Sequence, residues 1–105
     1  MNIDKARQRY IPMSETMLYI LLSLREERHG YGIMQHVKRL TQGRIVLGAG
    51  TIYQSIGKLE SDSLIRAGRE EDRKKYYTMT PLGAQILFEE AARIKEVHHH
   101  LEVLK

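Results

Sequence analysis

The residues best suited to chemistry lie on one face of the segment 48–65. Its apolar side chains recur at i, i+4 and i+7, the spacing of one stripe on a helix: Ile52, Ile56 and Leu59. At about 100° per residue, Gln54 and Lys58 fall opposite this stripe, and Thr51 and Tyr53 flank it. A side-chain amide pairs bidentately with a base edge, and an ammonium pairs with a phosphate. The face is therefore a candidate for contact with nucleic acid.

A short β ribbon is expected directly after this helix. Two extended runs, residues 64–69 and 75–79, flank a charged tip at residues 70–74, and side chains of the second run alternate with a period of two. Three cations stand together where the tip meets the second run: Arg73, Lys74 and Lys75. A helix followed by a cationic two-stranded ribbon indicates the winged form of helix-turn-helix. In that form the second helix enters the major groove and the ribbon reaches the neighbouring backbone.

Other chemistry finds little support in the sequence. There are no cysteines, which excludes disulfides and thiolate ligands. The histidines at 98–100 point about 100° apart on a helix and cannot converge on one metal ion. His29 and His36 have no serine or aspartate at triad spacing, and the glycines at 48 and 50 are too few for a nucleotide-binding loop. We therefore expect no enzyme, no cofactor and no metal site.

Composition fits one mainly α-helical domain with a small β wing. The 105 residues include 17 Lys and Arg against 13 Asp and Glu, a net charge of +4 that suits an acidic partner such as nucleic acid. The N-terminal residues are charged and contain no apolar leader. The longest apolar run, residues 17–22, is too short to cross a bilayer. A cytoplasmic protein without membrane contact is expected.

Three regions are expected along the chain. Residues 1–12 form a basic arm, either a frayed terminus or a strap across a partner subunit. The cations of this arm are Lys5, Arg7 and Arg9. Residues 13–80 form a winged-helix DNA-binding domain. Residues 81–105 form a C-terminal dimerisation helix, which begins with a capping threonine followed by proline.

Two further helices are expected ahead of the segment 48–65. The first begins at Ser14, which is placed to cap it, and is apolar on nearly all sides. The second spans residues 31–42, with Gly43 as its C-cap. Residues 44–47 are a short β-branched run that could pair with the ribbon as a third, minor strand.

The helix within residues 48–65 has two alternative starts. Thr51 and Gln54 fit a capping box, which would begin the helix at Ile52. Gly48 as N-cap would begin it a turn earlier and free the Thr51 hydroxyl to meet a phosphate. We favour the earlier start.

A homodimer is expected from two apolar surfaces. Apolar residues of the last helix recur at 3-4-3 spacing, a short coiled-coil seam that needs a partner helix, and the helix after Ser14 has more apolar surface than one domain covers. The residues expected at the interface are Leu18, Leu22, Ile94, Val97, Leu101 and Leu104. Such an interface could leave room for a small apolar or aromatic effector. The side chains expected around this effector are Met13, Met17, Tyr19, Ile20 and Ile94.

Six short motifs occur in a fixed order along the chain. They are His-Gly-Tyr-Gly-Ile at 29–33, Gly-Thr-Ile-Tyr at 50–53, Lys-Leu-Glu at 58–60, Leu-Ile at 64–65, Arg-Lys-Lys-Tyr-Tyr at 73–77 and Thr-Pro-Leu-Gly at 80–83. Together they resemble the PadR family, in particular its short members with a single C-terminal helix. The resemblance covers roughly residues 13–90.

The resemblance implies a homodimeric winged-helix transcriptional regulator, usually a repressor, that binds a palindromic operator. It assigns DNA contacts to Thr51, Tyr53, Gln54, Lys58, Arg73, Lys74 and Lys75. In short members, an apolar cavity at the dimer interface can take up flat or amphipathic molecules that weaken DNA binding. The alternative is a winged helix used for protein–protein contacts, but the cations lie where phosphates would be, which favours DNA.

Three departures from the family pattern bear on these expectations. Ser63 stands where glycine is usual, which costs roughly 1 kcal/mol if the backbone there is left-handed. The tip at residues 70–72 is acidic, which moves phosphate contacts back to residues 73–75. There is no tryptophan, so the stacking platform of drug-binding relatives is missing.

Overall fold

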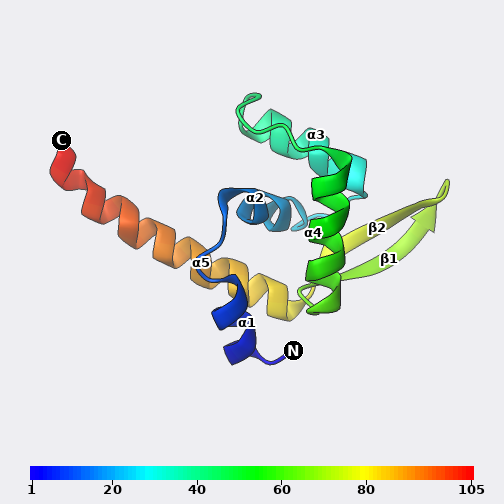
Figure 1. The fold of residues 1–105 in the computed structure, drawn as a ribbon, viewed down its shortest axis with the longest axis horizontal. Helices are drawn as coiled ribbons and strands as arrows, with labels where there is room; N and C mark the ends of the chain where they lie inside the picture. Colours follow the sequence, from blue (N-terminus) through cyan, green and yellow to red (C-terminus); the bar gives the residue numbers. More distant parts are fainter.

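The computed structural model describes all 105 residues and has the winged-helix fold (Figure 1). The helices and strands are α1 (Ile3–Tyr10), α2 (Glu15–Ser23), α3 (Gly30–Leu40), α4 (Ala49–Ser61), β1 (Ile65–Glu71), β2 (Lys74–Met79), α5 (Pro81–His100) and a short 3₁₀ helix η1 (Leu101–Leu104). The two strands form the wing, which projects from one side of the molecule. The C-terminal half of α5 projects from the other side (Figure 1).

Side-chain caps fix the starts of most helices. The Ser14 hydroxyl accepts the N–H of Met17 to start α2, and the His29 ring accepts the N–H of Gly32 to start α3. The fourth helix begins after Gly48, which has no side chain to cap it. The prediction of this earlier start for α4 is confirmed.

The core lies where α2, α3, α4 and the first turns of α5 meet. The predicted stripe of α4 is buried within it, and Ile20 and Leu21 of α2 are fully enclosed. The other large side chains with no exposed surface are Leu24, Ile33, Val37, Leu64 and Ile86. At roughly 1.5–3 kcal/mol for each fully buried aliphatic side chain, this cluster supplies most of the force that orients α4.

The wing is joined to the helices by a backbone pair that the sequence did not indicate. Arg28, between α2 and α3, exchanges both backbone hydrogen bonds with Tyr77 of β2, at 3.1 and 2.9 Å. Residues 44–47, predicted as a third strand, form no strand. That prediction was wrong because the run is committed to the turn between α3 and α4, where the Thr41 hydroxyl accepts the N–H of Ile45.

A tight junction connects α4, the wing and α5. Ser63 is left-handed with φ of 65°, so the condition for the steric cost of a serine there is met, and the N–H of Leu64 bonds back to the carbonyl of Leu59 at 2.9 Å. The Thr80 hydroxyl donates to the Ser63 carbonyl at 2.6 Å, and the Thr80 N–H donates to the Leu64 carbonyl at 3.0 Å. A Cβ at position 83 would stand 2.0 Å from the Leu64 oxygen, so only Gly83 fits there.

Residues 1–12 are not a frayed terminus, and that alternative was wrong; a strap across a partner subunit stays a prediction. Residues 3–10 fold as helix α1, with Ala6 and Tyr10 buried against the rest of the domain. Arg7 binds Glu89 of α5 through two hydrogen bonds, at 2.8 and 2.9 Å. The helix is ordered because Ile3, Ala6 and Tyr10 form a short apolar stripe that packs on the core, and Arg7 adds an acidic partner far away in the chain.

The left-handed backbone at Ser63 gives a stability prediction. We expect Ser63→Gly to raise the free energy of unfolding by roughly 0.5–1 kcal/mol, because glycine adopts this conformation without steric cost. Urea denaturation measures the change. The control, Ser61→Gly, places glycine at an exposed right-handed position at the end of α4 and should lower stability. A lower denaturation midpoint for Ser63→Gly would contradict the steric argument.

Candidate nucleic-acid interface

The polar face of α4 is open to solvent. The four side chains opposite or beside the buried stripe are exposed: Thr51, Tyr53, Gln54 and Lys58. Since Gly48 begins the helix, the Thr51 hydroxyl is not used as a cap. The face therefore presents one hydroxyl, one phenol, one amide and one ammonium to a partner.

A buried carboxylate fixes the C-terminal end of α4 to α1. Asp62 accepts hydrogen bonds from the Tyr10 hydroxyl at 2.6 Å and from the Arg9 guanidinium at 2.7 Å. Burial would raise the pKa of Asp62, but the hydrogen bonds from Tyr10 and Arg9 outweigh it and hold the pKa below its usual range. The Lys58 ammonium lies 5.1 Å from the centre of the Tyr10 ring. This cation–π contact holds the Lys58 side chain near α1.

The wing divides its cations into two groups. Arg69 is engaged within the protein, where its guanidinium pairs with Glu27 at 2.7 Å, pairs with Glu71 and lies 3.9 Å from the centre of the Tyr76 ring. The other cations of the wing are exposed and form no ion pair; Arg66 lies near the start of β1, and the remaining three stand together at the tip: Arg73, Lys74 and Lys75. These three are free to bind an external anion.

The wing tip is a two-residue turn. Asp72 and Arg73 have positive φ values of 52° and 65°, the pattern of the turns that suit a twisted hairpin. The ladder pairs Glu71 with Lys74 and Glu70 with Lys75, so the acidic and basic residues of the tip stand opposite each other. The unpaired positive charge of the tip therefore lies on Arg73 and on the start of β2.

A polar cleft of about 290 Å³ lies where the wing meets α3 and α4, and we term it the wing-root cleft. Its walls are formed by His29, Tyr31, Tyr53, Glu70, Arg73, Lys74, Lys75 and Tyr77. The His29 ring caps α3 and meets the Tyr76 ring edge-on at 5.0 Å. Burial, with Lys74 and Arg69 nearby, lowers the pKa of His29, so the imidazole is neutral at pH 7.

His29 and Tyr31 line this cleft but were not among the residues predicted to contact DNA. The neighbouring Gly30 could have indicated their place, because it allows α4 to approach the start of α3. A Cβ at position 30 would stand 2.9 Å from the Tyr53 ring, so a larger residue would displace Tyr53. A glycine at a helix start thus marked a close contact with a distant aromatic side chain.

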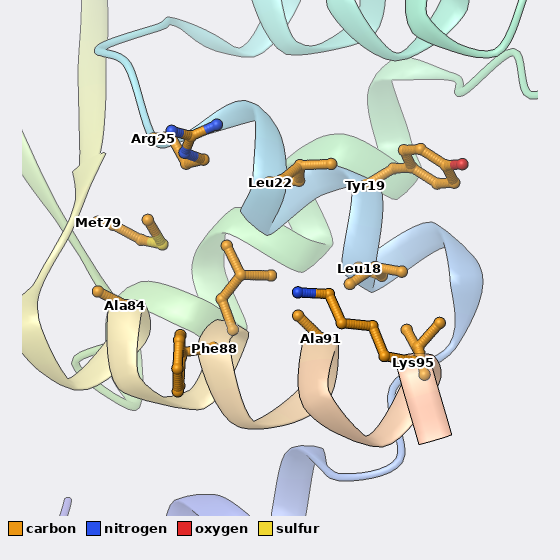
Figure 2. Close-up of a pocket in the computed structure, with 11 residues that line it drawn as sticks. Leu18, Tyr19, Leu22, Arg25, Met79, Ala84, Phe88, Ala91 and Lys95 are labelled. Atoms are coloured by element: carbon orange, nitrogen blue, oxygen red, sulfur yellow. The ribbon is translucent and has the colours of Figure 1, made fainter. Parts of the chain in front are cut away.

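An apolar groove lies between α2 and α5 (Figure 2). Its volume is about 510 Å³, and its lining is mainly apolar: Leu18, Tyr19, Leu22, Met79, Ala84, Leu87, Phe88, Ala91 and Ile94. Arg25 and Lys95 complete the lining as its two cations. Phe88 is 72% exposed, and an exposed aromatic side chain beside an apolar groove is typical of a binding surface.

The predicted effector residues are only partly at this groove. Tyr19 and Ile94 line it, whereas Met13 and Met17 pack against the core outside it. Ile20 has no exposed surface, so its prediction as an effector contact was wrong. The reason is that α2 is covered on several sides by α3, α4 and α5 of its own domain.

The predicted seam on the last helix is largely uncovered. Ile94 is half-buried, whereas Val97, Leu101 and Leu104 are 40%, 54% and 80% exposed. The α-helix ends at His100, so Leu101 and Leu104 lie in η1 and do not continue the same α-helical stripe. The histidines at 98–100 are exposed as well.

No helix of the protein is long and apolar enough to cross a bilayer.

Known proteins resemble this chain in sequence and in fold. The transcriptional regulator YqjI of Escherichia coli K12 is 34% identical over 97 residues, which cover 91% of this chain and 47% of that protein. The chain thus spans about half the length of this curated relative. A PadR family transcriptional regulator from Eggerthella lenta superposes with a TM-score of 0.70 at 25% identity, covering 97% of this chain and 87% of that one.

Bacillus subtilis PadR, solved in complex with operator DNA, superposes with a TM-score of 0.62 at 30% identity, over 74% of this chain and 47% of that one. The family model for PadR-like transcriptional regulators matches residues 17–89, from the middle of α2 into α5. This match contains the complete helix-turn-helix and wing, and it confirms the resemblance drawn from the short motifs. The chain belongs to the PadR-like family of transcriptional regulators.

Proposed function

We propose that this regulator binds a palindromic DNA operator as a homodimer and represses transcription, and that a small apolar or aromatic effector releases it. One observation supports DNA binding above all: the cations at the wing tip form no ion pair and lie beside the exposed polar face of α4. Duplex DNA requires both features, because phosphates supply most of the affinity and base edges supply the specificity.

The proposed DNA contacts come from two elements. Thr51, Tyr53, Gln54 and Lys58 of α4 face the major groove, and Arg73, Lys74 and Lys75 of the wing meet the flanking backbone. Support comes from Bacillus subtilis PadR, whose structure contains operator DNA. Other winged helices use the same face for protein contacts, and the salt dependence of binding separates the two functions.

The proposed homodimer rests on the uncovered apolar surface of α2 and α5. Leu18 and Leu22 line the groove with Ile94, Val97 is exposed on the projecting end of α5, and Leu101 and Leu104 are exposed in η1 beyond it. A single α4 and wing bury too little surface for tight specific binding, whereas two copies related by a two-fold axis read both halves of a palindrome. The α5 projection therefore serves as the dimerisation helix.

The proposed effector site is the groove between α2 and α5. Apolar walls suit a flat or aromatic molecule, and Tyr19 and Phe88 offer aromatic faces to it. Arg25 and Lys95 favour an effector that also carries an acidic group. Because the same side chains belong to the proposed dimer interface, an effector there would alter the spacing of the two recognition helices.

The wing cations give a prediction about salt dependence. We expect Lys74→Ala with Lys75→Ala to weaken binding to operator and random duplex alike, and each lost phosphate contact should lower the slope of log K against log salt by about one. Fluorescence anisotropy across a salt series measures this slope. The control, Lys5→Ala with Lys105→Ala, removes the same charge far from the wing and should leave most of the slope intact. An unchanged slope in the wing variant would exclude the wing from the interface.

Gln54 gives a prediction about base recognition. We expect Gln54→Ala to cost roughly 1–3 kcal/mol at one base position of each half-site, because the amide is the side chain of the outer face that pairs bidentately with adenine. Binding to random duplex should hardly change. The operator is first obtained by selection from a random-sequence library, and the control is Gln8→Ala on α1. A uniform loss over all sequences would mean that Gln54 only positions the helix.

The α5 seam gives a prediction about assembly. We expect Ile94→Glu with Leu101→Glu to place like charges against each other at the interface, shift the protein to monomer and abolish specific DNA binding while weak phosphate binding persists. Light scattering measures the mass, and circular dichroism verifies that the variant is folded. Ala92→Glu, exposed on the opposite side of α5, should remain dimeric. A folded seam variant that is still dimeric would place the interface elsewhere.

A further inference from the structure

We propose that the wing-root cleft is a binding site for a single backbone phosphate of the DNA, closed on the α3 side by Tyr31 and His29. The proposal rests on the proposed DNA-binding function and adds two residues to it. In this arrangement the phosphate lies between α3, α4 and the wing. It thereby bridges the base-reading helix and the ribbon.

The charges of the cleft favour an anion. Arg73, Lys74 and Lys75 line it without an ion-pair partner, whereas the neighbouring Arg69 is engaged by Glu27. The one carboxylate in the lining, Glu70, stands opposite Lys75 in the ladder and forms no ion pair with it. The cleft therefore has three cations against one anion and keeps an excess of positive charge.

The neutral side chains of the cleft offer hydrogen-bond donors. Tyr31 and Tyr53 are each 57% exposed, and their hydroxyls form no hydrogen bond within the chain, unlike the Tyr10 hydroxyl that is bonded to Asp62. Nδ1 of His29 accepts the N–H of Gly32 at 3.1 Å, which leaves the proton of the neutral ring on Nε2. Hydroxyl and imidazole donors are suitable ligands for phosphate oxygens, alongside the wing cations.

The size and place of the cleft fit a phosphate of the duplex. A volume of about 290 Å³ holds several groups the size of a water molecule, each with a share of ~30 Å³, and thus has room for a phosphate with its ester oxygens. Tyr53 belongs both to the cleft and to the outer face of α4. A helix lying in the major groove has the backbone at its edge, so an anion beside Tyr53 is a DNA phosphate of that edge.

The first test is Tyr31→Phe, which removes one hydroxyl and keeps the ring. Affinity for a selected operator and for random duplex should fall by the same factor, roughly tenfold, because a hydrogen bond to a charged oxygen is lost. The slope of log K against log salt should not change, since no charge is removed. Thr16→Val on α2 is the matched control, because it removes a hydroxyl outside both the cleft and the α2–α5 groove, and it should bind as wild type. Wild-type affinity in Tyr31→Phe would overturn the proposal.

The second test locates the phosphate. Operator duplexes carry a neutral methylphosphonate at one position of each half-site, and the position is moved along the strand. At one position the methylphosphonate should weaken binding of wild type by a larger factor than binding of Tyr31→Phe, because Tyr31→Phe has already lost its hydrogen bond to that phosphate while the wing cations remain. Additive losses at every position would overturn the proposal.

The third test separates a DNA phosphate from a free one. Inorganic phosphate at constant ionic strength should give wild type and Tyr31→Phe the same melting temperature shift. A shift found only in wild type would assign the cleft to a small anion and overturn the DNA assignment. The proposed function itself fails if wild type binds no duplex and the selection enriches no sequence. The cleft proposal alone fails if Gln54→Ala and the wing variant behave as predicted but Tyr31→Phe has no effect.

Discussion

The first turn of α5 lies directly on the backbone at Leu64, and the rest of the structure depends on this contact. Gly83 makes it possible, because a Cβ there would stand 2.0 Å from the Leu64 oxygen. Thr80 adds hydrogen bonds to the carbonyls of Ser63 and Leu64 while it caps α5. The short segment at Ser63 and Leu64 therefore joins the end of α4 to the start of β1 and contacts the start of α5. The directions of all three elements are fixed by the same few atoms.

This junction explains why the molecule presents two surfaces with distinct properties. On one side of it, α4 and the wing display hydroxyl, amide and ammonium groups and the unpaired cations of β2. On the other, α5 extends an apolar surface away from the core (Figure 1). The pair between Arg28 and Tyr77 gives the wing a second attachment, which limits how far the ribbon can swing relative to α3. The polar and the apolar surface are thus held by one rigid connection.

Features governed by local rules could be predicted from the sequence. The buried stripe of α4 follows from its spacing, and the starts of α2 and α5 follow from Ser14 and Thr80. The winged-helix fold followed from the order of these elements, and the family match confirms it. These features require only neighbours within a few residues in the chain.

Features that depend on distant partners could not be predicted. Helix α1 is held by Arg7 with Glu89 and by Tyr10 with Asp62, pairs separated by 82 and 52 positions. The burial of Ile20 depends on how three helices cover α2, and the closeness of Tyr31 to the wing depends on Gly30 admitting Tyr53. Periodicity indicates that a face is apolar or polar, but the identity of the covering element is set by tertiary packing.

The use of arginine within the fold has an electrical consequence. Arginines at six positions form ion pairs inside the chain, namely Arg7, Arg9, Arg28, Arg44, Arg69 and Arg93. Their fields are largely cancelled at a distance, whereas the ammonium groups of Lys74 and Lys75 are not paired. The unpaired ammonium groups therefore keep a positive potential at this edge of the wing. This potential reaches about a Debye length into the solvent, about 8 Å at physiological salt, so it attracts an anion before any contact forms.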